Sequence, residues 1–215
     1  MKLTRRHTLA LGAAATAIGL VGLPAVQAAE GDVVNQDALM NPAGGLSDHV
    51  LGEEDAPVTI IEYASPTCPH CASFHNEVYP QLKEQYIDTG EVKLIVRPFV
   101  RNVLDAAIFM LAEAAGEDSY HNVIETYFNT QMTWATSEAP RDAIFEIAQD
   151  LGFTQESFDA ALTNQELFVA MEAMREQALN DFGLEGTPTF YINGKTLSGG
   201  KTLEQLTAEI DPLLN

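Results

Sequence analysis

The motif Cys68-Pro69-His70-Cys71 constrains this chain more than any other feature, because it holds the only two cysteines in the sequence. The apolar run before it, residues 56–64, predicts a buried strand, and the amphipathic segment after it predicts a helix. Two thiols at such a junction are typical of a redox pair. One thiol lies at the first helical turn, where free amide N–H groups and the helix dipole favour the thiolate, and the other lies behind it. We therefore expect a disulfide that opens and closes.

Two other uses of the cysteine pair have to be weighed. A static disulfide across so few residues closes a very small loop and stabilises a fold little through chain entropy. A zinc or copper site needs two more ligands, and His49, His75 and His121 show neither a second C-x-x-C nor a His-x-x-x-His spacing. Redox chemistry is therefore the favoured interpretation. A copper-binding carrier stays as the alternative from another class of protein.

The first 28 residues predict an export signal. Lys2, Arg5 and Arg6 precede an uncharged run from residue 8 to residue 26, and cleavage is expected near Ala28. The run is short and rich in Gly and Ala, which is typical of a signal peptide and not of a membrane span. The paired arginines also resemble a twin-arginine signal, with the general secretory route as the competing interpretation. Either route predicts a periplasmic protein, in a compartment where a disulfide persists.

The chain is strongly acidic, with a formal net charge of −20. Removal of the signal takes away three of the eleven basic residues and no acidic one, so the mature chain is more negative still. An acidic surface repels nucleic acid and anionic membranes, and we expect neither as a partner. The charge is typical of a highly soluble surface.

The order of predicted elements indicates an α/β fold. A polar, loose N-terminal lead over residues 29–52 comes first, followed by strand, helix and strand. A block that is helical throughout then extends from about residue 102 to 183. Two further strands, joined by the turn Asn193-Gly194, and a final helix complete the chain. The expected strands cover residues 56–64, 92–98, 189–192 and 195–198.

Helix start signals divide the helical block. A side-chain cap is expected at Asn102, Thr154 and Asn164, a helix start at Ser119, and a proline in the first helical position at Pro140. Met171 and Met174 lie on one helix and could suggest soft metal binding, but the apolar face that they extend favours core packing.

Together these features resemble the DsbA-like periplasmic thiol:disulfide oxidoreductases of the thioredoxin superfamily. The resemblance is carried by the Cys68–Cys71 motif, by Glu62 before it, by the helical insertion and by Gly186-Thr187-Pro188-Thr189-Phe190 at the start of a strand. It covers residues 53–213 and implies a thioredoxin fold with an all-helical insertion, at about residues 102–183, between its βαβ and ββα halves. It also implies an enzyme that oxidises dithiols in exported proteins, with its own Cys68–Cys71 disulfide and no other cofactor.

The resemblance assigns catalytic roles around the motif. Cys68, expected to be exposed, is the nucleophile, and Cys71 is the shielded resolving thiol. His70 and Pro69 belong to the same catalytic set, because a partly cationic His70 imidazole in the first helical turn stabilises the Cys68 thiolate. Stabilising this thiolate stabilises the reduced enzyme, which makes its disulfide a stronger oxidant.

Glu62, Thr187 and Pro188 complete the expected site. Glu62 interrupts an apolar strand, so we expect a buried carboxylate, although a solvated strand face is the alternative. In the resembled family a glutamate at this offset helps to move the proton of the resolving thiol. Pro188 resembles the cis-proline opposite the cysteines, where the Thr187 backbone would pair with an extended substrate strand. An ordinary trans proline is the alternative.

The resemblance also implies partners. These are unfolded or reduced exported proteins as substrates and a quinone-linked membrane enzyme that restores the disulfide, with the protein itself a monomer and no metal bound. A disulfide isomerase or reductase is the competing activity. Such enzymes usually need a dimerisation domain ahead of the core, and residues 29–52 are too few for one.

Overall fold

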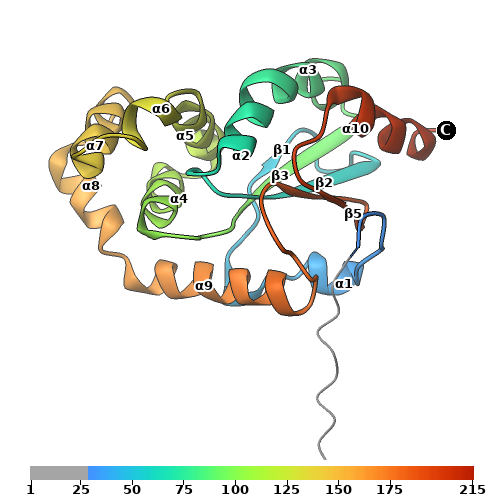
Figure 1. The fold of residues 1–215 in the computed structure, drawn as a ribbon, viewed down its shortest axis with the longest axis horizontal. Coiled ribbons are helices and arrows are strands. Elements are labelled where there is room, and N and C mark those ends of the chain that lie inside the picture. Colours follow the sequence, from blue (N-terminus) through green and yellow to red (C-terminus); the bar gives the residue numbers. More distant parts are fainter. Residues whose placement is uncertain (1–28) are drawn as a thin grey trace, which may run out of the picture.

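The computed structural model describes residues 29–215, and a five-stranded sheet forms its centre (Figure 1). The strand order is β1-β3-β2-β4-β5, with β2 and β3 parallel and the other neighbouring pairs antiparallel. The strands are β1 (Val50–Leu51), β2 (Val58–Ala64), β3 (Val92–Pro98), β4 (Thr189–Ile192) and β5 (Lys195–Ser198). This is the predicted α/β architecture, in which strands from both halves of the chain form one sheet.

Both faces of the sheet are covered, which explains why its central strands are apolar at nearly every position. Along β2, Ile60 packs into a cluster on one face and Ile61 into a cluster on the other, because successive side chains of a strand point in opposite directions. The hairpin between β4 and β5 turns at Asn193 and Gly194, whose φ angles are 45° and 87°. Positive φ at both positions is what a tight hairpin turn requires, and the predicted hairpin is confirmed.

The segment after the cysteine motif is a continuous helical run whose winding changes along its length. It consists of α2 (Pro69–Ser73), η2 (Phe74–Val78), α3 (Tyr79–Leu82) and η3 (Lys83–Ile87), of which η2 and η3 are π-helical. Pro80 has no N–H and disfavours a regular helix before it, and the Tyr79 N–H bonds to the Phe74 carbonyl in a wider turn. This run shares one face of the sheet with α10 (Leu203–Ile210) and the short η4 (Asp211–Leu213) (Figure 1).

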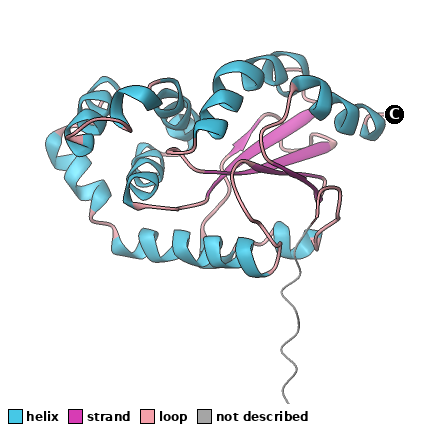
Figure 2. Cartoon of the chain, viewed as in Figure 1, coloured by secondary structure: helices cyan, strands magenta, loops and turns pink. Residues whose placement is uncertain are grey.

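The segment between β3 and β4 is helical throughout apart from its loops (Figure 2). Its helices are α4 (Val103–Ala115), α5 (Glu117–Asn129), α6 (Gln131–Trp134), α7 (Pro140–Asp150), α8 (Gln155–Leu162) and α9 (Gln165–Asn180). The side chains of Asn102, Thr154 and Asn164 cap α4, α8 and α9, and Pro140 opens α7. The predicted insertion and these helix starts are confirmed.

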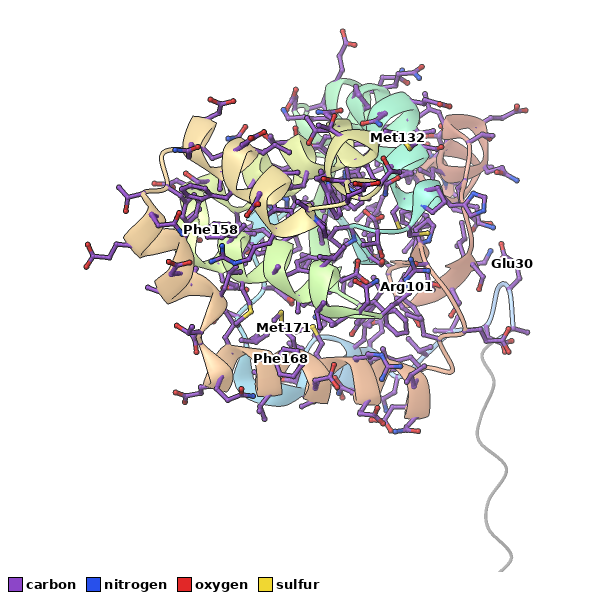
Figure 3. All side chains as sticks on the ribbon, turned by 60° about the vertical axis from the view of Figure 1, so that its left-hand side comes forward. Glu30, Arg101, Met132, Phe158, Phe168 and Met171 are labelled. Carbon is purple, nitrogen blue, oxygen red and sulfur yellow. The ribbon has the colours of Figure 1, made fainter. Side chains whose placement is uncertain are left out.

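Two details of the insertion differ from the prediction. α5 begins at Glu117 and not at Ser119, because Gly116, with a φ of 84°, already ends α4 and opens the next helix. The short helix α6 was not predicted, and its Trp134 is fully buried and donates its indole N–H to the Tyr127 carbonyl at 2.8 Å. Phe158 of α8 and Met171 of α9 are fully buried as well (Figure 3).

The N-terminal lead folds onto the sheet, which corrects the prediction of a loose segment over residues 29–52. It contains α1 (Gln36–Leu39), η1 (Ala43–Gly45) and β1, which pairs with β3. Gly44 packs so closely on α9 that a Cβ there would lie 2.3 Å from the Ala170 carbonyl oxygen. The Asp48 carboxylate accepts two hydrogen bonds of 2.7 Å from the buried Arg97 guanidinium. These partners are far away in the sequence, so the polar composition of the lead gave no indication of the contacts.

The predicted signal peptide, with its paired arginines, falls within residues 1–28 and lies outside the described residues. Its cleavage point and the boundary of the mature chain therefore stay predictions. Among residues 29–215, no helix combines the length and the apolar character needed to cross a membrane.

Candidate active site

Cys68 and Cys71 lie where β2 passes into the helical run, and both are free thiols. Cys68 is the extended N-cap residue of α2, Pro69 opens the helix, and Cys71 follows within the first turn. The prediction that Cys68 is exposed is wrong, because its exposed fraction is 3%, against 0% for Cys71. The loop that carries Thr187 lies against its sulfur, whereas Pro69 and His70 are exposed.

The surroundings of Cys68 favour its thiolate and lower its pKa from 9.0 to about 5. The largest cause is a hydrogen bond from the Cys71 thiol. The Thr187 side chain and the backbone N–H groups of Cys71 and His70 add to it, and together they outweigh the opposing effect of burial. The backbone groups are free to do this because the first turn of a helix leaves its N–H groups unpaired. His70 thus contributes through its backbone, and the predicted effect of its imidazole stays a prediction.

The Thr187–Pro188 peptide bond is cis, as the resemblance implied. In the dithiol form the Cys68 thiol donates to the Thr187 carbonyl oxygen at 3.2 Å. The Thr187 hydroxyl oxygen is buried without a fixed hydrogen-bond partner within residues 29–215, so it is available to the sulfur once the thiol ionises. The pairing of the Thr187 backbone with a substrate strand stays a prediction.

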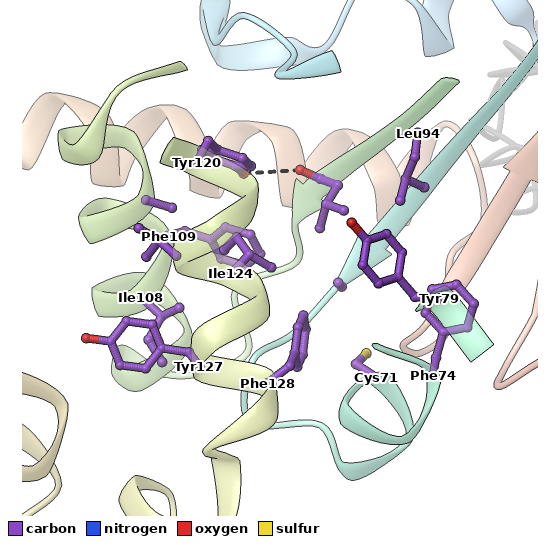
Figure 4. Packing of buried hydrophobic residues seen from close by; sticks show 14 of the residues in the cluster. Cys71, Phe74, Tyr79, Leu94, Ile108, Phe109, Tyr120, Ile124, Tyr127 and Phe128 are labelled. Atoms are coloured by element: carbon purple, nitrogen blue, oxygen red, sulfur yellow. Dashed lines mark hydrogen bonds between the residues drawn. The ribbon is translucent and has the colours of Figure 1, made fainter. Parts of the chain in front are cut away.

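Cys71 lies in the apolar core under the sheet-facing side of the helix (Figure 4). Burial raises the pKa of the Cys71 thiol well above its ordinary value, and the hydrogen bond with Cys68 and the charge of Glu62 raise it further. Glu62 is on β2 between Ile60 and Ala64, which belong to the core cluster on the same face, and its exposed fraction is 0%. The predicted burial of Glu62 is confirmed.

Sequence reasoning missed the partner of Glu62, which is His75. The Nε2 atom of His75 lies 2.9 Å from the Oε2 atom of Glu62, and both residues are buried. His75 was considered only as a metal ligand. Its spacing of four residues from Cys71 is the signal that could have found it, since residues one turn apart lie on the same face of a helix.

Asp105, in the first turn of α4, holds the loop between β2 and Cys68. Its fully buried carboxylate accepts hydrogen bonds from the Ser65 hydroxyl at 2.9 Å, the Thr67 N–H at 2.8 Å and the Arg101 N–H at 2.9 Å. The Arg101 guanidinium also donates to the hydroxyl oxygens of Ser65 and Thr67. The start of the helical insertion therefore fixes the active-site loop.

Gln131 of α6 holds the same loop from a second direction. Its buried side-chain amide donates to the Pro66 carbonyl at 2.6 Å and to the Cys68 carbonyl at 3.0 Å. No sequence signal identifies Gln131 or Asp105, because both lie far along the chain from the motif and belong to no recognised pattern around it.

The three histidines considered as metal ligands do not lie at one place. His75 lies beside Glu62, whereas the His121 ring bonds to the His49 carbonyl near α4 and α5. In the part of the chain that the structure describes, no group of three or more His, Cys, Asp or Glu side chains is placed to hold a metal ion.

The ionisation of Cys68 gives a direct test of this site. We expect the ultraviolet absorbance of the thiolate in the reduced protein to rise with a midpoint near pH 5, because the pKa of Cys68 is lowered to about 5. Cys71→Ala removes the largest cause of this shift and should move the midpoint upward by about one pKa unit or more. A wild-type midpoint near the ordinary thiol value of 9.0 would contradict the described electrostatics.

Two comparisons with known proteins agree with this geometry. Residues 46–212 match the family model described as thioredoxin. The structure resembles that of alpha-DsbA1 from Wolbachia pipientis with a TM-score of 0.74 and 30% sequence identity, over 78% of this chain and 91% of that one. This chain is a DsbA-like member of the thioredoxin family.

Curated relatives carry names from the same family. The "Probable disulfide bond formation protein D" of Bacillus anthracis is 31% identical over 67% of this chain and 69% of its own length. The "Putative protein-disulfide oxidoreductase" of Rickettsia felis is 31% identical over 78% of this chain. This chain spans 60% of the length of that Rickettsia relative. BdbD from Bacillus subtilis, at 21% identity and a TM-score of 0.68, shares the DsbA-like fold.

Proposed function

We propose that this chain is a thiol:disulfide oxidoreductase that introduces disulfides into exported proteins through Cys68 and Cys71. The observation that carries the proposal is that the pKa values of the two thiols are shifted in opposite directions. The pKa of Cys68 falls to about 5, while the pKa of Cys71 rises well above its ordinary value. Stabilising one thiolate stabilises the reduced form of the enzyme, so the disulfide form is readily reduced by substrate thiols.

The chemistry proceeds by two thiol–disulfide exchanges. A substrate thiolate attacks Cys68 Sγ in the disulfide, the bond to Cys71 breaks, and Cys71 leaves with the electron pair and then takes up a proton. A second substrate thiolate attacks the substrate sulfur of this mixed disulfide, and Cys68 leaves as a thiolate. The substrate has lost two electrons, and the enzyme has gained them as the Cys68 thiolate and the Cys71 thiol. The low pKa of Cys68 makes it the better leaving group in the second step.

The location and partners follow from the same function. The N-terminal sequence, with its basic residues and apolar run, supports export to the periplasm. The substrates are reduced or unfolded exported proteins, and a quinone-linked membrane enzyme accepts the electrons and restores the disulfide. The protein works as a monomer, and its acidic charge argues against nucleic acid as a partner.

Oxidation of a reduced, unfolded model protein tests the function. Stoichiometric amounts of the oxidised enzyme should remove free thiols from reduced ribonuclease A near neutral pH, and Cys68→Ala should remove none. A matched assay uses ribonuclease A with scrambled disulfides. Recovery of ribonuclease activity from the scrambled protein, without net oxidation of the reduced one, would identify an isomerase instead. Binding of copper by both cysteines without any thiol oxidation would identify a metal carrier.

A further inference from the structure

Glu62 and His75 form an isolated polar pair beneath the cysteines. Their side chains are 0% and 3% exposed, and one hydrogen bond of 2.9 Å joins Glu62 Oε2 to His75 Nε2. The remaining polar atoms, Glu62 Oε1 and His75 Nδ1, are buried and bond to no other group within residues 29–215. A buried carboxylate is costly unless it is paired, so His75 is what makes a charged Glu62 tolerable in this core.

Aromatic rings enclose the imidazole on its other sides. The ring of Phe128 on α5 stacks on His75 at 4.1 Å between centroids, and the rings of Phe74 and Tyr79 lie at 5.3 Å. Figure 4 shows these three aromatic side chains gathered around Cys71. The Tyr79 hydroxyl donates to Glu125 and not to the histidine. The imidazole therefore has its hydrogen bond with Glu62 and an apolar environment elsewhere.

The ionisable groups around the pair come from three helical elements. They are Cys68 and Cys71 at the start of α2, Tyr79 on α3, and Glu125 and His121 on α5. Glu125 bonds to Tyr79, and burial lowers the pKa of His121 to about 4, so His121 is uncharged near neutral pH. The strand neighbours of Glu62, Val96 and Phe190, are apolar. Of the groups whose charge changes during the reaction, Cys71 is therefore the one closest to the Glu62–His75 pair.

We propose that Glu62 and His75 act together as the proton-holding pair for Cys71, with His75 as a positioning residue that fixes the carboxylate and shares its proton. This inference rests on the proposed oxidase function. In the disulfide form the pair holds an extra proton. When the Cys68–Cys71 bond breaks, that proton passes to the buried Cys71 thiolate, and it returns to the pair when Cys71 re-forms the disulfide. Opening the disulfide brings one negative charge to Cys71, and the proton transfer moves this charge to the Glu62 carboxylate, where the hydrogen bond with His75 stabilises it.

Three variants test the role of His75. His75→Gln keeps a hydrogen-bond donor but cannot ionise, Glu62→Gln removes the carboxylate, and the double variant leaves two neutral amides. The matched control is His49→Gln, because His49 and Glu113 form another imidazole–carboxylate pair, at 3.1 Å, between the N-terminal lead and α4. The measurement is the rate at which each oxidised protein oxidises a short dithiol peptide, followed across pH in a stopped-flow instrument, together with the ionisation midpoint of Cys68.

We expect His75→Gln to slow oxidation of the peptide about tenfold or more near neutral pH and to flatten the pH profile, as loss of a general acid does. The Cys68 midpoint and the behaviour of His49→Gln should stay as in the wild type. The double variant should be no slower than Glu62→Gln alone, because two residues that act as one unit give non-additive effects. The comparison of the double variant with Glu62→Gln still tests the proposal if His75→Gln alone does not fold.

Two results would overturn the inference while leaving the oxidase function intact. One is a His75→Gln protein whose pH profile matches that of an active wild type. The other is a double variant that is slower than Glu62→Gln by the full factor of the His75→Gln change, since additive effects mean independent roles. A wild-type protein that fails to oxidise the peptide at any pH would instead overturn the proposed function, and this inference with it.

Discussion

Cys71→Ser should turn this protein into a trap for its substrates, whereas Cys68→Ser should trap almost nothing. In the Cys71→Ser protein the Cys68 thiolate still attacks a disulfide of a partner and forms a mixed disulfide, while the other partner sulfur leaves as a thiolate. The Cys71 thiol that would release the bound partner is gone. Non-reducing gels of periplasmic extracts should therefore show a ladder of covalent adducts that disappears on reduction. Mass spectrometry of the adducts would identify the exported substrates.

The expected asymmetry comes from ionisation and not from exposure. Both cysteines are nearly inaccessible in the dithiol form, at 3% and 0% exposure. The pKa of Cys68 is about 5, while burial holds Cys71 in its neutral thiol form, and only a thiolate attacks a disulfide. The double variant Cys68→Ser/Cys71→Ser is the background control. Equal trapping by the two single variants would show that the nucleophile is assigned incorrectly.

Reduction should make the folded protein more stable near neutral pH, the reverse of what a structural disulfide does. The thiolate of Cys68 is stabilised only in the reduced, folded protein, whose pKa for this group is about 5 against 9.0 for an ordinary thiol. Near pH 7 only the interval between the folded pKa and the pH contributes, at about 1.4 kcal/mol for each pH unit, so the gain is on the order of 2 kcal/mol. Urea denaturation of the reduced and oxidised forms measures the difference.

The pH dependence of this difference has a defined sign. Because the folded pKa of Cys68 is lowered, its contribution is fully present above the unfolded pKa of 9.0 and is lost as the pH falls through about 5. The raised pKa of Cys71 has no effect on stability below the unfolded thiol pKa. The reduced form should therefore lose its advantage progressively between these two pH values. An oxidised form that is the more stable one throughout this range would favour a static disulfide.

Most of the fold follows from local patterns in the sequence. Apolar runs predicted the central strands, Asn193 and Gly194 predicted the hairpin, and Asn102, Thr154 and Asn164 predicted three helix starts. These signals are readable because each depends on neighbours a few residues away. The structure of the N-terminal lead could not be predicted in this way, because β1 is held by pairing with β3 and by the Asp48–Arg97 ion pair.

The candidate site likewise has a part that local sequence patterns predict and a part that they do not. The redox pair and the buried glutamate could be predicted from Cys68, Cys71 and Glu62, because a short motif and an apolar strand indicate them. The cis bond before Pro188 was implied only by the resemblance to a known family. The sequence alone determined that this protein holds a pair of thiols at a strand-to-helix junction in an α/β fold, which predicts redox chemistry.

Only the tertiary structure decided what surrounds that dithiol. The fold brings His75 to Glu62, Asp105 and Gln131 to the active-site loop, and Thr187 over Cys68. It also buries Cys68, which the sequence pattern placed in solvent. The reason is physical: hydrogen bonds and burial depend on distance in space, and apart from His75 these residues lie dozens of positions from their partners in the chain.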